Sequence, residues 1–109
     1  MYVEIRRHHC RLPEVALTDA IETTAVVDFR EAAGGLIATP VGSSITELTY
    51  YAAVSPGVTP LPLYDAGGSA VTQSVAAGGT YVLPEACFGA GVLAIVADAA
   101  GSVALSLKG

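Results

Sequence analysis

The sequence predicts an all-β protein: a two-layer antiparallel β-sandwich, jelly-roll-like, with about eight strands. Three observations predict this fold. Short apolar or alternating runs are separated by frequent Gly, Pro and Asp turn signals. No segment shows the 3.6-residue period of a helix. Hydrophobic residues make up 52% of the 109 residues but aromatic residues only 6%, a composition that suits thin β-layers. A closed β-barrel is the alternative architecture.

The chain is expected to divide into an extended basic N-terminal arm, residues 1–20, and a sandwich domain, residues 21–109. The start of the arm is polar and basic, and Leu12-Pro13 interrupts any helix or central strand. A chain segment with so little apolar content is normally mobile unless it docks on something. The remaining length is enough for one two-layer core.

The first half of the sandwich domain shows clear strand patterns. Residues 21–29 alternate between two faces, and a short strand over residues 36–39 is stopped by Pro40. Residues 43–54 form the longest predicted strand, and the pattern places Tyr50 on its core-facing side.

The middle of the chain is rich in turns. Pro56-Gly57 fits the central positions of a type II turn, and Pro62 marks the following extended segment as an edge strand. Two glycine turns then introduce strands over residues 70–76 and 80–83. Residues 84–89 are expected to form a short 3₁₀ or helical crossover.

The C-terminal segment contains the strand around which the others are expected to pack. Residues 92–97 are apolar at every position, which is typical of a strand covered on both faces. Residues 102–108 alternate strictly, and a turn from Asp98 to Gly101 joins the two runs. The sequence therefore predicts a C-terminal β-hairpin with a central first strand.

Charge is scarce and unevenly distributed. Charged residues make up 14% of the chain, against about 25% in a typical soluble domain. So few charges in the sandwich domain indicate one of two things: a surface that contacts other protein, or a surface that is neutral because its residues are small and uncharged. The net charge of −5 argues against nucleic-acid binding, and no apolar run is long enough to cross a membrane. The sequence starts without the pattern of a signal peptide, so synthesis in a reducing cytosol is expected.

No enzymatic constellation is present in the sequence. The only histidines, His8 and His9, are adjacent in the arm, so a Ser-His-Asp site would require the arm to fold over the body. Asp28, Asp65 and Asp98 fall at strand ends or turns, where hydrogen bonding to nearby backbone is their usual role. We therefore expect no enzyme activity and no cofactor.

The only metal-like cluster is His8-His9-Cys10. Adjacent residues of an extended chain point to opposite sides, so a zinc ion would need further ligands from Cys87 or from another copy. We expect no metal site. A disulfide between Cys10 and Cys87 stays open, because spacing alone does not establish it.

Three stretches carry a family resemblance: Tyr64-Asp65-Ala66-Gly67-Gly68-Ser69-Ala70-Val71-Thr72, then residues 75–84, and Cys87-Phe88-Gly89. Together with the closing turn at Asp98, this pattern resembles small β-sandwich proteins of tailed bacteriophages. The resemblance implies a non-enzymatic structural protein of a virion: a capsid decoration or cement protein, or a neck component. It implies two kinds of partner, namely further copies of the chain (a homo-oligomer, for example a trimer) and a capsid or other virion protein.

On this hypothesis the arm binds the partner. Arg6, Arg7 and Arg11 would meet carboxylates of a neighbour, while Ile5 and Leu12 would fill apolar gaps. Contact of the arginines with phosphate is an alternative. A chain beginning near Ile21 is expected to fold, because the predicted sandwich is complete without the arm.

The alternative function is a carbohydrate-binding β-sandwich module. Tyr50, Tyr51, Tyr64 and Tyr81 would form a stacking platform for a sugar, although Tyr50 is also a predicted core residue and the chain has no Trp.

Overall fold

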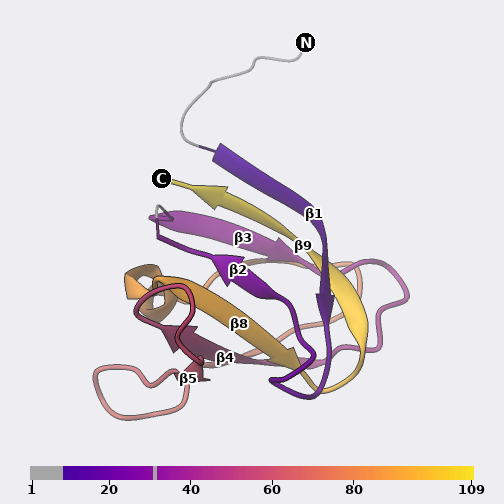
Figure 1. The fold of residues 1–109 in the computed structure, drawn as a ribbon. Helices are drawn as coiled ribbons and strands as arrows, with labels where there is room; N and C mark the ends of the chain where they lie inside the picture. The colour runs from indigo at the N-terminus through magenta and orange to yellow at the C-terminus, as the bar shows by residue number, and fades with distance from the viewer. Residues whose placement is uncertain (1–8, 31) are drawn as a thin grey trace.

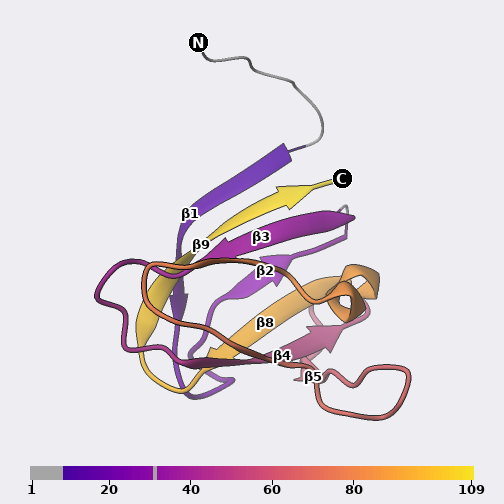
Figure 2. The ribbon, with the colours of Figure 1, turned by 180° about the vertical axis from the view of Figure 1, so that it is seen from behind.

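The computed structural model describes residues 9–30 and 32–109, which form two β-sheets packed face to face (Figures 1 and 2). Sheet A has the strand order β1-β9-β3-β7, and sheet B has the order β2-β8-β4-β5, with β6 also paired to β4. The elements are β1 (His9–Leu17), β2 (Val26–Asp28), β3 (Gly34–Ala38), β4 (Glu47–Ala53), β5 (Leu61–Pro62), β6 (Thr72–Ser74), β7 (Thr80–Val82), the 3₁₀ helix η1 (Glu85–Gly89), β8 (Val92–Ala97) and β9 (Gly101–Lys108).

The strands pair in a nested order. β1 pairs with β9, β2 with β8, β3 with β7, and β4 with both β5 and β6, all antiparallel. Further pairing of β3 with β9 and of β4 with β8 completes the two sheets. The chain is thus a long double ribbon rolled into two layers, which is the jelly-roll arrangement. The predicted fold class is confirmed.

One edge of sheet B is interrupted, so that two short strands, β5 and β6, share it. Leu63 and Val71 both hydrogen-bond to the backbone of Tyr50, and the chain between them makes an excursion away from the sheet. β5 and β6 therefore occupy successive parts of one edge of β4. Pro62 lies in this edge strand, as predicted.

β8 is the buried central strand that the sequence predicts. It lies between β2 and β4, and residues 92–95 are all buried. Ile95 is 1% exposed and belongs to the main core cluster, together with Leu93. The predicted C-terminal hairpin, however, is wrong: β8 and β9 belong to different sheets and do not pair.

The turn between β8 and β9 is a corner between the sheets. The Asp98 carboxylate accepts hydrogen bonds from the Thr46 hydroxyl, from the Thr46 N–H (2.9 Å) and from the Glu47 N–H (3.2 Å). Because these donors stand at the start of β4, they hold the turn to sheet B while the chain crosses to sheet A. The turn chemistry was recognisable from sequence, but its partner 52 residues away in the chain was not.

The expected boundary after residue 20 needs correction. Residues 9–17 form β1, an edge strand of sheet A that pairs with β9. Val15 and Leu17 are buried and belong to the core cluster. A register shift between Leu12 and Val15 accommodates Pro13, so the proline that indicated an arm lies at an edge-strand irregularity. Residues 1–8 lie outside the described part of the chain.

Candidate interaction surfaces

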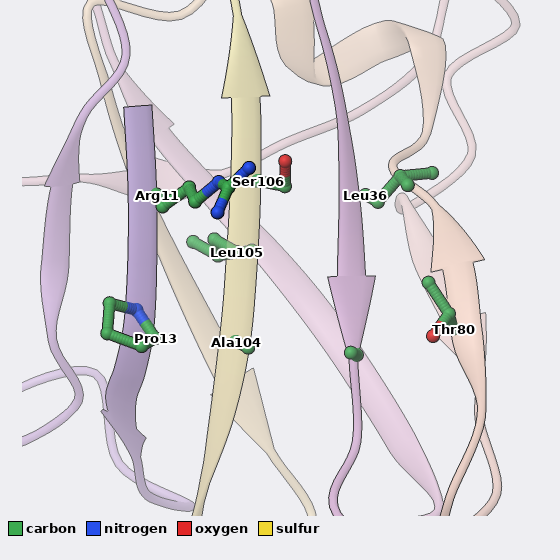
Figure 3. Close-up of a pocket in the computed structure, with 8 residues that line it drawn as sticks. Arg11, Pro13, Leu36, Thr80, Ala104, Leu105 and Ser106 are labelled. Atoms are coloured by element: carbon green, nitrogen blue, oxygen red, sulfur yellow. The ribbon is translucent and has the colours of Figure 1, made fainter. Parts of the chain in front are cut away.

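The outer face of sheet A is hollowed by a shallow groove, which we call the outer groove (Figure 3). It consists of two adjoining hollows of about 380 and 310 Å³ that share Pro13, Ala38 and Ala104. It crosses β1, β9, β3 and β7. Its lining residues are Arg11, Pro13, Glu14, Leu36, Ala38, Thr39, Pro40, Thr80, Ser102, Ala104, Leu105 and Ser106.

Side-chain size produces this groove. Along its floor β9 presents the small outward residues Ala104 and Ser106, and Ala38 pairs with Ala104 from β3. On the far side the groove is lined by Leu36, which is 43% exposed, and by Thr80. Val82, the cross-strand neighbour of Leu36, lies beside this lining and is 70% exposed. Such a neutral face on an acidic protein offers apolar contact with little charge to desolvate.

Arg11 is the cation of the outer groove. It lies on β1 opposite Ser106 of β9, is exposed, and extends toward β9 in Figure 3. No residue in the described ranges forms an ion pair with it. The only carboxylate of the lining, Glu14, stands in the second hollow, away from Arg11. The Arg11 guanidinium is therefore available to a carboxylate of a partner.

A second hollow, the end pocket, lies at the end of the sandwich where β4 finishes. Its volume is about 500 Å³, and none of the described residues that line it carries a charge. The lining residues are Ala52, Ala53, Val54, Val58, Thr59, Leu61, Leu63, Ala86, Gly89 and Ala90. Apolar side chains remain exposed there, notably Val54 (86%), Val58 (48%) and Leu61 (67%).

A close backbone approach forms one wall of the end pocket. The Gly91 N–H donates to the Ala53 carbonyl at 2.8 Å, and a Cβ atom at Gly91 would lie 2.2 Å from the Val54 carbonyl oxygen. Only glycine permits this contact. It fixes the segment after η1 against the end of β4, and thereby holds η1 beside the 54–60 loop.

The residues predicted to bind a partner are not brought together as one arm. Ile5, Arg6 and Arg7 lie outside the described residues. Arg11 is exposed in the outer groove, whereas Leu12 packs on the core of its own chain. The structure therefore assigns Leu12 to this sandwich instead of to a neighbour.

The tyrosines do not form a common platform. Tyr50 is fully buried, and its hydroxyl donates to Gln73 Oε1 at 2.6 Å, while Gln73 Nε2 donates to the Val82 carbonyl at 2.9 Å. This chain of hydrogen bonds links sheet B to sheet A, and burial raises the pKa of Tyr50. The Tyr81 hydroxyl accepts from the Ala76 N–H at 2.7 Å. Among the tyrosines that the structure describes, only Tyr64 is largely exposed, at 57%.

The two cysteines are not paired. Cys10 is exposed on β1, and Cys87 is buried in η1, where burial raises the pKa of its thiol to about 12. A disulfide between them is therefore not formed. Within residues 9–30 and 32–109, no group of His, Cys, Asp and Glu side chains could hold a metal ion. His8, part of the metal-like cluster, is outside these ranges.

The aspartates at strand ends have the local roles predicted for them. Asp65 Oδ1 accepts from the N–H groups of Gly67 and Ser69. Asp28 accepts from the backbone and the guanidinium of Arg30, hydrogen bonds that lower the pKa of Asp28 to about 2.

The corner aspartate gives a pH-dependent prediction. The hydroxyl of Thr46, followed by the nearby N–H groups, lowers the pKa of Asp98 below its ordinary value. The ionised carboxylate thus stabilises the fold above about pH 4, and this contribution is lost as the pH falls through the folded-state pKa. We expect Asp98→Asn to lower Tm at pH 7 and the difference from wild type to shrink on acidification, as measured by calorimetry.

Asp19→Asn is the matched control, since Asp19 is an exposed carboxylate in a turn at the same end of the sandwich. A Tm difference for Asp98→Asn that stays constant from pH 7 to pH 3 would contradict the assigned role.

Comparison with protein-family models, curated proteins and solved structures finds no match to this chain. No helical segment in the described ranges is long and apolar enough to cross a membrane.

Proposed function

We propose that this chain is a non-enzymatic structural protein of a phage or virus-like particle. In this role it is a capsid-associated decoration, cement or neck component that binds further copies of itself and a virion protein. The observation that carries the proposal is the outer groove: a neutral, largely apolar sheet face with one available arginine. A face of this kind suits contact with another protein, because little charge has to be desolvated.

Two further observations support the proposal. Viral capsid domains are among the protein groups built on jelly rolls, a group that also includes lectins and cupins. The turn sequences at Asp65 and Gly78, on which the phage resemblance rests, are the ones that shape the loops beside β5 and β7. On this reading the protein acts within the virion after synthesis in the host cytoplasm.

The carbohydrate-binding alternative has less support from the site. Tyr50 is buried and the Tyr81 hydroxyl is engaged by backbone, so these rings do not form the stacking platform that the alternative requires.

The proposal predicts that the chain is part of purified particles. Density-gradient-purified particles from cells that carry the gene should contain the chain by mass spectrometry, at a fixed ratio to the major capsid protein. Leu36→Glu should reduce incorporation about tenfold or more, because it places a charge in the apolar wall of the outer groove.

Val41→Glu is the control, because Val41 is 91% exposed in a loop outside the groove. Absence of the chain from purified particles would contradict the proposal. Binding of the monomeric chain to an oligosaccharide on a glycan array would favour the carbohydrate module instead.

A further inference from the structure

We infer that the end pocket receives the N-terminal residues 1–5 of a second copy of the chain. This inference rests on the proposed function, since it names the contact through which copies would associate. The pocket is apolar and uncharged, and its volume of about 500 Å³ lies within the range that accommodates specific guests. Its rim leaves Val54, Val58 and Leu61 exposed. A guest must therefore be apolar and free of charge where it enters.

The sequence before β1 has this character. Residues 1–5 read Met-Tyr-Val-Glu-Ile, so in an extended conformation Met1, Val3 and Ile5 would lie on one side and Tyr2 and Glu4 on the other. The one charged side chain of the segment, Glu4, is thus on the opposite side from its aliphatic residues.

The charges that flank residues 1–5 are complementary to the charge beside the end pocket. Arg6 and Arg7 directly follow the apolar segment. Glu85 directly precedes the lining residue Ala86 on η1; it is exposed and has no ion-pair partner among the residues that the structure describes. The outer groove is a poorer host, because its own Arg11 would repel the two arginines.

The position of β1 favours a second copy over the same chain. The start of β1 lies at the same end of the sandwich as β5 and η1, which contribute to the lining of the end pocket (Figures 1 and 2). β1, however, is an edge of sheet A, while β5 is at the far edge of sheet B. With residues 1–5 seated in a pocket, only residues 6–8 connect it to β1, and three residues span at most about 11 Å when extended. Reaching the pocket of their own chain would require crossing three strand spacings and one layer, roughly 17 Å in a straight line, which is longer than this connection. A second copy whose residues 1–5 face this end of the sandwich can enter the pocket without crossing the two sheets.

The test uses the full chain in three forms: wild type, a pocket variant Leu61→Asp, and an arm variant with both Val3→Asp and Ile5→Asp. Sedimentation velocity over a concentration series should show self-association of wild type, weakened about tenfold or more in each variant. Val41→Asp is the matched control, because it also places a charge at an exposed valine but at the opposite end of the sandwich. It should associate as wild type does.

Mixing gives the decisive measurement. The arm variant keeps an intact pocket and the pocket variant keeps an intact arm, so an equimolar mixture should associate more strongly than either variant alone. A synthetic peptide of residues 1–8 should bind the arm variant, and Leu61→Asp in that background should weaken binding about tenfold. Glu85→Gln should weaken binding at low salt more than at high salt.

Three results would overturn the inference. The first is no binding of the peptide to the arm variant, and the second is a mixture that associates no better than its components. The third is peptide binding together with a wild-type chain that stays monomeric, because the segment would then lie in the pocket of its own chain. The proposed function fails separately. If the chain is present in particles but these variants associate normally, only this inference is lost. If the variants behave as expected but particles lack the chain, the contact stands without the virion role.

Discussion

Removal of residues 1–20 is expected to abolish folding. The deletion takes away β1, and with it the core side chains Val15 (6% exposed) and Leu17 (1% exposed). It also exposes the edge of β9 with which β1 pairs. Each buried aliphatic side chain contributes about 1.5–3 kcal/mol before cavity effects, and the total stability of a small domain is typically about 5–15 kcal/mol. Circular dichroism and calorimetry should therefore show no cooperative transition.

The control is a chain beginning at His9. It keeps all the described strands and should retain a cooperative transition close to that of the full chain. A chain beginning at Ile21 that unfolds at the wild-type Tm would show that β1 is dispensable, as the sequence alone had suggested.

The second large effect is expected from Ile95→Asp. Ile95 is 1% exposed in β8, with strands on both sides and the opposite sheet above it. An unpaired carboxylate there would cost about 3–5 kcal/mol. In a domain of this size each kcal/mol corresponds to roughly 4–8 °C, so Tm should fall by more than about 10 °C, or the chain should not fold at all.

Val26→Asp is the matched control for Ile95→Asp. Val26 lies on the neighbouring strand β2 but is 54% exposed, so an aspartate there stays hydrated and should change Tm little. An unchanged Tm for Ile95→Asp would show that β8 is not the central buried strand.

Strand character and turn chemistry were predictable because they are local. The continuous apolar run of residues 92–97 identified a strand buried on both faces, and the glycine turns placed most strand ends correctly. Strand partners were not predictable in the same way. Asp98 to Gly101 has the residues of a hairpin turn, yet a hydrogen bond from the Thr46 hydroxyl to Asp98 holds this turn at the start of β4. A contact between residues so far apart in the sequence is not predictable from local sequence patterns.

The edge strand β1 shows a related limit. Its charges and Pro13 argue for an arm, and these features are equally suited to an edge strand with one free side. Only the burial of Val15 and Leu17 decides between the two. Of the predicted binding residues, Arg11 is exposed in the structure, but the groove beside it was not predictable from sequence. That groove depends on small side chains from β9 and β3 that lie far apart in the sequence.

The nested pairing also sets the order of events during synthesis. β8 and β9, the last strands to emerge from a ribosome, are the inner strands that separate β2 from β4 and β1 from β3. Until residues 92–108 are available, β1 and β2 have no partner, and their apolar side chains have nothing to pack against. β3 can pair with β7, and β4 with β5 and β6, before then, but neither sheet can be completed. Completion requires contacts of long sequence separation, which form slowly. During that delay the nascent chain depends on its polar loops and acidic charge to limit association of its exposed apolar strands.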